Sequence, residues 1–479
     1  MRWSFALSLP DPLEEASSRM RPYFQRILED HRIVRHEDGT VSTAIDRIVL
    51  HERTGSIALA SLSDEGIPVQ NSGSVFGFVD HISATDPASR MRARMPQGEV
   101  FIDAMQDECQ RHGIPLWLPG QDGHGIVHVA APELGIAFPG ATLVCPDSHT
   151  TTLGALGALA WGIGTSRCEK VLATNCLRLR PSRNLLIRFF GRRGERVSAK
   201  DIVLDILYRH GTTCALGFAV EFRNSDQDIL DMDERFTLCN MAVELGATAA
   251  IVPPDTVTLN YVVGRRFSPP RAYLERMVQE NRTSQATAAM FDHVLDINLA
   301  AVRPMISWGT NPGETSPVAA GVPKALSGES LVAMNYTGLE PGSSLSGLPI
   351  DGAFIGSCTN SRLSDLRRAA AVLKGKTIAD RVRGIVVPGS QQVKKQAEAE
   401  CLDKIFVQAG FEWHIPGCGL CFFAGGSDFK AGDRVVSTTN RNFNGRQGPN
   451  VRTHICSPET VAWSAVNGCI SDIMELPDV

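Results

Sequence analysis

Three of the twelve cysteines lie in surroundings that suit ligands of a metal cluster. Cys358 follows an apolar segment that predicts a short strand, so its thiol is expected at the carboxyl end of that strand, where open α/β sheets bind ligands. Cys418 and Cys421 form a Cys-x-x-Cys pair whose neighbouring glycines let backbone amides approach an anionic sulfur cluster. Three thiolates can hold three irons of a cubane and leave the fourth open as a Lewis acid.

The spacing of these cysteines alone leaves other chemistries open. A Cys-x-x-Cys pair also occurs in redox sites and as half of a zinc site. The sequence has no second Cys-x-x-Cys pair and no closely spaced histidine pair to complete a zinc site. A cluster that serves only electron transfer would need a fourth ligand. Cys401, Cys456 and Cys469 are the late candidates, and none of them lies in a glycine-rich loop.

Short apolar segments alternate with amphipathic ones along the chain, which predicts α/β layering. Strands are predicted near 44–51, 127–130, 141–144, 185–190, 249–252 and 353–356, and helices over 13–30, 100–111 and 363–373. Residues 359–361 are expected to cap the last of these helices. From about 307 to 349 glycine, proline and serine interrupt the pattern, which indicates an irregular connection between domains.

The bulk composition is that of a globular protein of two or three domains. Of the 479 residues, 43% are hydrophobic and 21% charged, and no apolar run reaches the roughly 18 residues that span a bilayer. The net charge of −5 gives no support for nucleic-acid binding. Six arginines between 178 and 193 alternate with apolar residues, which predicts solvated strand faces. Without a secretory signal, the cysteines are expected as reduced thiols in the cytoplasm.

Three segments of the C-terminal third resemble the signatures of aconitase-type dehydratases. These are Phe354 to Arg362, Pro416 to Cys421 and Ser437 to Arg446. Further resemblance is found at 125–128, 147–150, 162–166, 238–241 and 308–313. The resemblance extends from about residue 45 to the C-terminus. It is closest to the large subunits of 3-isopropylmalate dehydratases in the aconitase superfamily.

The resemblance implies a fold and a partner. The fold would be α/β, with three αβα domains around one [4Fe-4S] cluster per chain, held by Cys358, Cys418 and Cys421 with one iron free of cysteine. The expected ranges are 1–20 for a tail, 21–183, 184–300 and 301–479. The swivelling fourth domain, with its serine base, is missing and would come from a separate small subunit.

The resemblance also assigns roles for eliminating water from a 2-hydroxy dicarboxylic acid and returning it at the neighbouring carbon. Asp80 would orient His81 as the proton donor, and Asp147 with His149 would face the hydroxyl, while His128 and Glu244 would form a second imidazole–carboxylate pair. The expected substrate-binding residues are His51, Ser148, Asn240, Asn440, Arg441 and Arg446. Taken singly, these residues would be interpreted as core histidines, a local turn or surface arginines.

Some positions depart from the usual dehydratase pattern, notably Leu134, Pro146, Leu153 and residues 73–78. They leave the cluster and arginine positions intact and leave the substrate open. The preferred reaction is 2-isopropylmalate to 3-isopropylmalate, in leucine biosynthesis. The alternatives are a homoaconitase-type or a methylmalate- or dimethylmalate-type dehydratase. A non-enzymatic iron-sensing RNA-binding protein is less well supported, because it would need an exposed basic surface.

Overall fold

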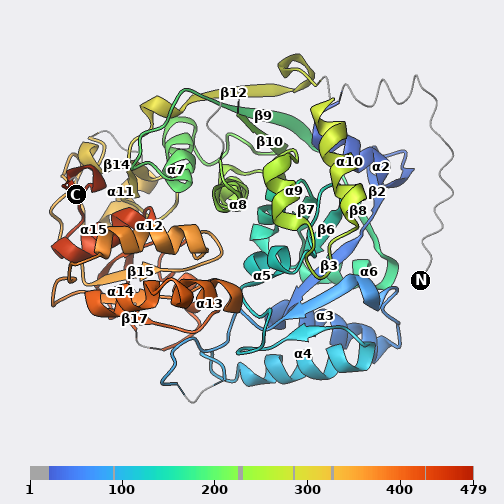
Figure 1. The fold of residues 1–479 in the computed structure, drawn as a ribbon, viewed down its shortest axis with the longest axis horizontal. Helices are drawn as coiled ribbons and strands as arrows, with labels where there is room; N and C mark the ends of the chain where they lie inside the picture. The colour runs from blue at the N-terminus through green and yellow to red at the C-terminus, as the bar shows by residue number, and fades with distance from the viewer. Residues whose placement is uncertain are drawn as a thin grey trace.

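The computed structural model describes residues 21–89, 92–224, 230–283, 286–324, 328–426 and 428–477. Within these residues, three parallel sheets follow one another along the chain, with two small antiparallel sheets beside them. Figure 1 shows the first sheet and its helices in blue and teal, the third in orange and red, and the long strands of the second along the top. No helix among the described residues has the length and apolar character to cross a membrane.

The first sheet has the strand order β5-β4-β3-β6-β7, and all its neighbours pair in parallel. Its strands are β3 Arg47–His51, β4 Val75–Phe78, β5 Leu116–Trp117, β6 Thr142–Cys145 and β7 Leu159–Gly162. Helices α3 Glu52–Glu65, α4 Glu99–His112, α5 Val127–Glu133 and α6 Thr165–Thr174 accompany it. A small antiparallel sheet of β1 Arg32–Arg35, β2 Val41–Ala44 and β8 Cys176–Leu179 lies beside it, next to helix α2 Tyr23–Asp30.

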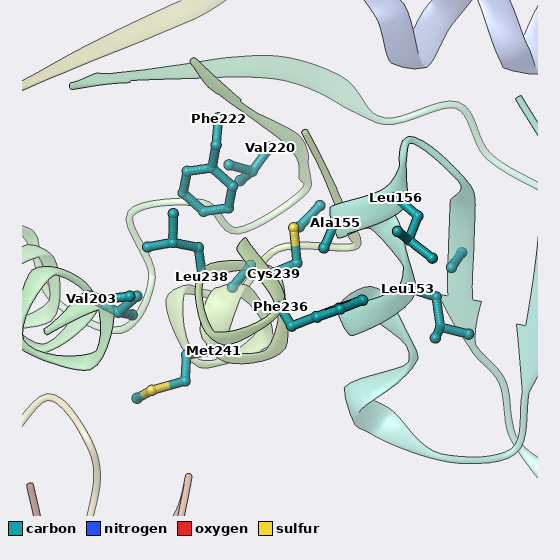
Figure 2. Close-up of a cluster of buried hydrophobic side chains, with 14 of the residues drawn as sticks. Leu153, Ala155, Leu156, Val203, Val220, Phe222, Phe236, Leu238, Cys239 and Met241 are labelled. Carbon is teal, nitrogen blue, oxygen red and sulfur yellow. The ribbon is translucent and has the colours of Figure 1, made fainter. Parts of the chain in front are cut away.

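The second sheet has the order β11-β10-β9-β12, again in parallel. Its strands are β9 Arg183–Phe190, β10 Phe218–Asn224, β11 Ala249–Ile251 and β12 His293–Asn298. Its helices are α7 Ala199–His210, α8 Met232–Met241, α9 Thr256–Val262 and α10 Arg271–Arg282. Figure 2 shows side chains of α8 packed between Val220 and Phe222 of β10 and the 3-10 segment η2 Ser148–Leu156. This packing fixes α8 against the segment that begins with Ser148 and His149.

The third sheet has the order β17-β16-β15-β18-β19 in parallel, with β15 at its centre. Its strands are β15 Gly352–Ile355, β16 Arg383–Val386, β17 Phe411–Trp413, β18 Arg434–Ser437 and β19 Arg452–Ile455. Helices α12 Leu363–Leu373, α13 Gln391–Ala399, α14 Leu402–Ala409 and α15 Pro458–Asn467 pack beside it. Because the strands are parallel, the segments after β15 and β18 leave the sheet at the same edge.

Most predicted elements are confirmed. The segments at 141–144, 185–190, 249–252 and 353–356 form β6, β9, β11 and β15, and the helices at 100–111 and 363–373 are α4 and α12. The predicted strand at 44–51 begins later, at Arg47, and Ala44 ends β2 instead. Of the helix predicted over 13–30, residues 13–20 lie outside the described part, and α2 covers 23–30.

Three predictions about local structure are wrong. Residues 127–130 form helix α5 rather than a strand, because a helix buried on every side has the same continuous apolar sequence as a buried strand. The N-cap of α12 is Arg362, and the Asp365 carboxylate accepts its backbone N–H at 3.1 Å, so residues 359–361 do not cap it. The stretch 307–349 is not wholly irregular: it contains β14 Thr315–Pro317 and helix α11 Gly328–Thr337.

Candidate functional site

The three predicted cysteines line one cavity of about 340 Å³. Cys358 follows β15, and Cys418 and Cys421 border the short 3-10 segment η7 Gly419–Cys421. Each cysteine is 7% exposed or less. Gly419 has a φ of +52°, and a Cβ at this position would lie 2.9 Å from the Val387 side chain, so glycine allows the tight turn between the two cysteines.

The sulfur atoms accept hydrogen bonds from polar side chains around the cavity. Asn240 and Asn440 both donate through Nδ2 to Cys358 Sγ, at 3.1 and 3.5 Å. Arg446 donates to Cys421 Sγ at 3.3 Å and to Asn440 Oδ1 at 3.2 Å. The structure thus places both asparagines and Arg446 at the cysteines. Donors arranged in this way stabilise anionic sulfur.

The chemistry of the thiols fits an iron–sulfur cluster. Burial raises the pKa of Cys358 to about 12 and that of Cys418 well above its ordinary value, so without a cation both would be protonated thiols at neutral pH. Iron supplies the positive charge that turns such thiols into thiolates. The other cysteines do not line this cavity. Three convergent thiols with sulfur-directed donors therefore match the predicted ligand set.

His81 lies between two carboxylates at the wall of the cavity. Its Nδ1 is 2.8 Å from Asp80 Oδ1, and its Nε2 is 3.0 Å from Asp147 Oδ2. Burial opposes protonation, but the charge of Asp80 and the hydrogen bonds that His81 donates to both carboxylates raise the pKa of His81 well above its ordinary value. The imidazole is therefore a cation that can donate a proton at neutral pH.

Asp80 connects this imidazole to the loop that carries Cys418 and to helix α5. Its backbone oxygen accepts the Cys418 N–H at 3.0 Å, and its carboxylate accepts the Val127 N–H at 2.8 Å. Burial alone would favour the neutral carboxyl, but the charge and hydrogen bond of His81 lower the pKa of Asp80 to about 2. The carboxylate is thus fixed in position and remains ionised.

A second chain of polar contacts begins at His149. Its Nε2 is 3.1 Å from Glu244 Oε1, and the same oxygen accepts the Arg441 Nε–H at 2.8 Å. Arg441 also donates to Ser148 Oγ at 3.1 Å. The predicted pairing of His128 with Glu244 is therefore wrong. The distance of 95 residues between His149 and Glu244 gave no sequence signal for their contact.

His128 has a different environment from His81 and His149. Its Nδ1 lies 3.7 Å from Asp147 Oδ1, and its buried Nε2 has no hydrogen-bond partner among the described residues. Burial lowers the pKa of His128 to about 4, so the ring is neutral. His128 lines the cavity, and an unsatisfied ring nitrogen there is free to bind a group that enters it.

His51 lies behind His81 rather than in the wall of the cavity. The two rings stack with centroids 3.8 Å apart, and His51 Nε2 is 3.1 Å from the Pro146 carbonyl oxygen. The residues that line the cavity do not include His51, so its predicted contact with substrate is not reproduced. The ring instead supports His81 from behind.

The predicted site lacked several residues that the structure brings to it. Buried Glu52 accepts the backbone N–H groups of Asp80 and Ile82 at 3.1 and 2.6 Å and so fixes the loop that carries His81. Ser357, with a positive φ of 75°, contacts Cys421 Sγ at 3.1 Å. Arg53, Phe422, Phe423 and Phe443 line the cavity. Adjacency in the sequence was the available signal, since Glu52 follows His51, Ser357 precedes Cys358 and Phe422 follows Cys421.

The positions that depart from the dehydratase pattern lie outside the cavity wall. Leu153 is fully buried in the core that the first and second sheets share, and Leu134 packs against the same core. Pro146 contributes its carbonyl oxygen to the contact with His51. These departures therefore alter packing around the site, and the polar contacts within it remain.

Comparisons with known proteins show what this chain is similar to. The model of the aconitase family (aconitate hydratase) matches residues 25–468. The large subunit 1 of 3-isopropylmalate dehydratase from Bradyrhizobium diazoefficiens is 42% identical over 464 residues, which cover 95% of this chain and 97% of that protein. The crystal structure of holo aconitase X from Thermococcus kodakaraensis aligns with 98% of this chain and 100% of its own, at a TM-score of 0.46 and 10% identity. The chain belongs to the aconitase family.

Proposed function

We propose that this chain is the large subunit of a hydro-lyase that isomerises a 2-hydroxy dicarboxylic acid by dehydration and rehydration. The preferred reaction converts 2-isopropylmalate to 3-isopropylmalate, in leucine biosynthesis. The name of the relative that is 42% identical supports this choice. The observation that carries the proposal is that three buried thiols and a cationic imidazole, His81, share one cavity. The enzyme is placed in the cytoplasm, where thiols stay reduced.

Cys358, Cys418 and Cys421 would hold one [4Fe-4S] cluster, with one iron free of cysteine. When bound, the cluster supplies a Lewis acid that polarises the C–O bond of the substrate hydroxyl. The hydrogen bonds around the thiols support this assignment: Asn240 donates to Cys358 Sγ, Arg446 donates to Cys421 Sγ, and the Cys418 N–H donates to the Asp80 carbonyl oxygen. The protein then has to bind the carboxylates and move the protons.

His81 donates the proton that allows the hydroxyl to leave as water. Asp80 and Asp147 hold the imidazole from both sides, so its direction and its charge are fixed before substrate binds. Asp147 also accepts the His149 backbone N–H at 2.7 Å, which ties the donor to the segment that carries Ser148. Proton transfer by a group positioned in this way is a general-acid step.

Arginines at the cavity bind the two substrate carboxylates. Arg441 is oriented by Glu244 and is next to Ser148, so its guanidinium and the hydroxyl present donors together. Arg446 is held at Cys421 and Asn440, and its Nε has no partner among the described residues. A planar fork of N–H donors suits bidentate recognition of a carboxylate.

A separate small subunit supplies the base that removes the carbon-bound proton, a serine on its swivelling domain. The name "large subunit" of the Bradyrhizobium relative supports a partner of this kind. Among the described residues, Ser148 is the one serine that lines the cavity, and its hydroxyl already contacts Arg441 and His149. Its hydroxyl is thus committed to carboxylate binding, and the base has to come from elsewhere.

Aromatic side chains favour a substrate with an apolar substituent. Phe422, Phe423 and Phe443 line the cavity, and the last two are 39% and 50% exposed. An alkyl group that covers them would remove apolar surface from water. The alternatives are a homoaconitase-type reaction, whose substrate carries a third carboxylate, and a methylmalate- or dimethylmalate-type reaction with smaller substituents.

The test is turnover by the anaerobically reconstituted chain with its small subunit. Formation of the unsaturated intermediate is followed by ultraviolet absorbance with 2-isopropylmalate, homocitrate, 2-methylmalate or 2,3-dimethylmalate. We expect the highest kcat/KM with 2-isopropylmalate and no turnover when the small subunit is omitted. A higher kcat/KM with homocitrate would establish the homoaconitase alternative. No turnover of any of these acids by a cluster-loaded complex would contradict the proposal.

A further inference from the structure

Lys200 is a fully buried lysine behind the candidate cluster loops, and burial lowers the pKa of its ammonium group to about 7. It lies in the first turn of α7 and has no exposed surface. Its Nζ donates to Asn360 Oδ1 at 3.0 Å, to the Thr439 carbonyl oxygen at 2.8 Å and to the Thr438 carbonyl oxygen. All three N–H donors of the ammonium are therefore used, and all three acceptors are neutral.

No carboxylate forms an ion pair with Lys200 in the part of the chain that the structure describes. Asp201 and Asp365 are near enough to favour the ammonium, but their oxygens accept bonds from Met305, Ser198, Asn360 and the Arg362 backbone. Burial of a cation without a partner is strongly unfavourable. A first-turn position adds to this, since the helix dipole disfavours a cation there. By comparison, buried Arg235 contacts Asp255 at 2.6 Å.

The acceptors of Lys200 belong to the two segments that surround Cys358. Asn360 follows that cysteine by two residues, and Thr439 immediately precedes Asn440, which donates to Cys358 Sγ. If Cys456 and Cys421 were thiolates, they would be near enough for their negative charge to raise the pKa of Lys200. An anion at the cysteines would therefore be close to this unpaired cation.

A second buried cation holds the same loop. The Arg362 guanidinium is 3% exposed, and it donates to the Cys358 carbonyl oxygen at 3.0 Å and to the His128 carbonyl oxygen at 3.2 Å. The acceptors of the guanidinium are backbone carbonyl oxygens, which are again neutral. Two cations with neutral acceptors thus surround one cysteine loop, which is unfavourable unless the loop carries negative charge.

We propose that Lys200 is the counter-charge of the cluster: its ammonium offsets the negative charge of the cysteine thiolates and resists loss of an electron from the group they hold. This inference rests on the cluster assigned under the proposed function. A fixed cation stabilises the more negative, reduced state of a nearby redox group. The residue touches neither substrate nor cluster ligands, so it is a positioning residue.

The test compares the rate of oxidative cluster loss in reconstituted variants of the full chain. Ferricyanide accepts one electron from the cluster, one iron(II) ion then leaves, and the remaining three-iron cluster gives an electron paramagnetic resonance (EPR) signal. Lys200→Gln keeps hydrogen-bond donors without the charge, and Lys200→Arg keeps the charge. We expect the signal to form at least about fivefold faster in Lys200→Gln than in wild type, and at nearly the wild-type rate in Lys200→Arg.

Thr237→Val is the matched control for loss of a neutral contact to the same loop. Thr237 Oγ1 donates to the Thr359 carbonyl oxygen at 3.0 Å and accepts from Asn360 Nδ2 at 3.3 Å. If Thr237→Val and Lys200→Arg accelerate the loss as much as Lys200→Gln, the role is structural and the proposal is overturned. An unchanged rate in Lys200→Gln overturns it too.

If Lys200→Gln does not fold, judged by circular dichroism, Lys200→Met replaces it, because methionine is apolar and of similar length.

Two further outcomes separate this inference from the proposed function. If wild type forms no cluster, the proposed function falls, and the inference falls with it. If wild type forms a cluster whose loss is indifferent to the charge at position 200, the inference alone is contradicted.

Discussion

At the scale of the residue, the site depends on imidazoles that neighbouring groups hold in different charge states. His81 is a cation because two carboxylates flank it, whereas His128 is neutral because burial outweighs its distant contact with Asp147. A cationic imidazole, His81, and a neutral imidazole, His128, therefore face the same cavity. Groups whose environments move their pKa values apart are typical of acid–base sites.

Replacement of His81 by glutamine tests the proton donor. Because glutamine keeps a hydrogen bond and loses the transferable proton, we expect kcat to fall by roughly 10²- to 10⁴-fold, with iron content unchanged. Steady-state kinetics and iron analysis of the reconstituted complex measure both. His210→Gln is the control, since His210 lies exposed at the end of α7. A kcat close to wild type in His81→Gln would remove His81 from the mechanism.

Arg441→Lys tests carboxylate binding. The substitution keeps the charge and loses the planar fork that Glu244 orients, so we expect KM to rise by roughly tenfold or more, with a smaller change in kcat. Arg367→Lys is the control, because Arg367 forms an exposed ion pair with Glu400. An unchanged KM would show that Arg441 does not bind the substrate.

At the scale of the element, the site residues stand at the ends of strands and the starts of helices. His81 follows β4, Asp147 follows β6 and Cys358 follows β15, each at the carboxyl edge of a parallel sheet. Asn240 lies in α8 and Glu244 in the 3-10 turn η3 Ala242–Leu245, and they contact Cys358 and His149 in the wall of the cavity. The precision of the site therefore depends on how firmly these short elements are anchored.

Asp231 is the N-cap of α8 and forms a capping box with Glu234. Because its carboxylate accepts the Glu234 N–H at 2.9 Å, we expect Asp231→Ala to lower the free energy of unfolding by about 0.5–2 kcal/mol. Denaturant unfolding followed by circular dichroism measures this. Asp64→Ala, at an exposed position near the end of α3, is the control and should change stability little. Equal effects of the two substitutions would contradict the role of the cap.

A histidine–carboxylate contact attaches the end of α2 to the first sheet. His31 Nε2 is 2.9 Å from Asp46 Oδ2. Burial opposes the shift, but Asp46 raises the pKa of His31 above its ordinary value of 6.5, and His31 in turn lowers the pKa of Asp46 below 3.8. The contribution of His31 is therefore complete below pH 6.5 and is lost as the pH rises through the raised value. The contribution of Asp46 to stability is lost only as the pH falls through its lowered pKa.

His31→Gln should accordingly destabilise the chain more at pH 6 than at pH 9. The difference should be at most about 1 kcal/mol, because Asp46 is partly exposed and solvent screens the pair. Denaturant unfolding at the two pH values, with His210→Gln as control, measures it. A larger loss of stability at pH 9 than at pH 6 would contradict the assigned direction.

The elements that the sequence predicted best are the short apolar strands bounded by turn residues, such as β6 and β15. Helix α5 was mistaken for a strand because nothing in its apolar sequence separates the two. The three cysteines of the cavity, with Arg441 and Arg446, could be predicted together because each lies in a contiguous motif. The pairing of Glu244 with His149 could not be predicted, since it depends on how α8 packs against η2. Lys200 gave no signal at all, because a lone lysine is ordinarily solvated.

At the scale of the whole molecule, one cavity is lined by residues from segments of the first and third parallel sheets, and Asn240 and Glu244, from the range of the second sheet, contact Cys358 and His149 in its wall. Figure 1 shows these sheets arranged around α5 and α8, which lie between them. We propose the ranges 21–183, 184–300 and 301–479 as three domains, because each contains one parallel sheet apart from Arg183, the first residue of β9. The Cys418 N–H donates to the Asp80 carbonyl oxygen. This bond joins the loop that carries Cys418, in the third range, to the loop that carries Asp80 and His81, in the first.

The central claim is that three cysteines hold an open cubane, and EPR spectroscopy of the anaerobically reconstituted chain tests it most directly. After mild oxidation, wild type should lose one labile iron and give the signal of a three-iron cluster. Cys358→Ser, Cys418→Ser and Cys421→Ser should each abolish that signal, whereas Cys401→Ser, at an exposed cysteine outside the cavity, should keep it. A chain that binds no cluster, or a redox-stable cluster indifferent to these three cysteines, would contradict the account.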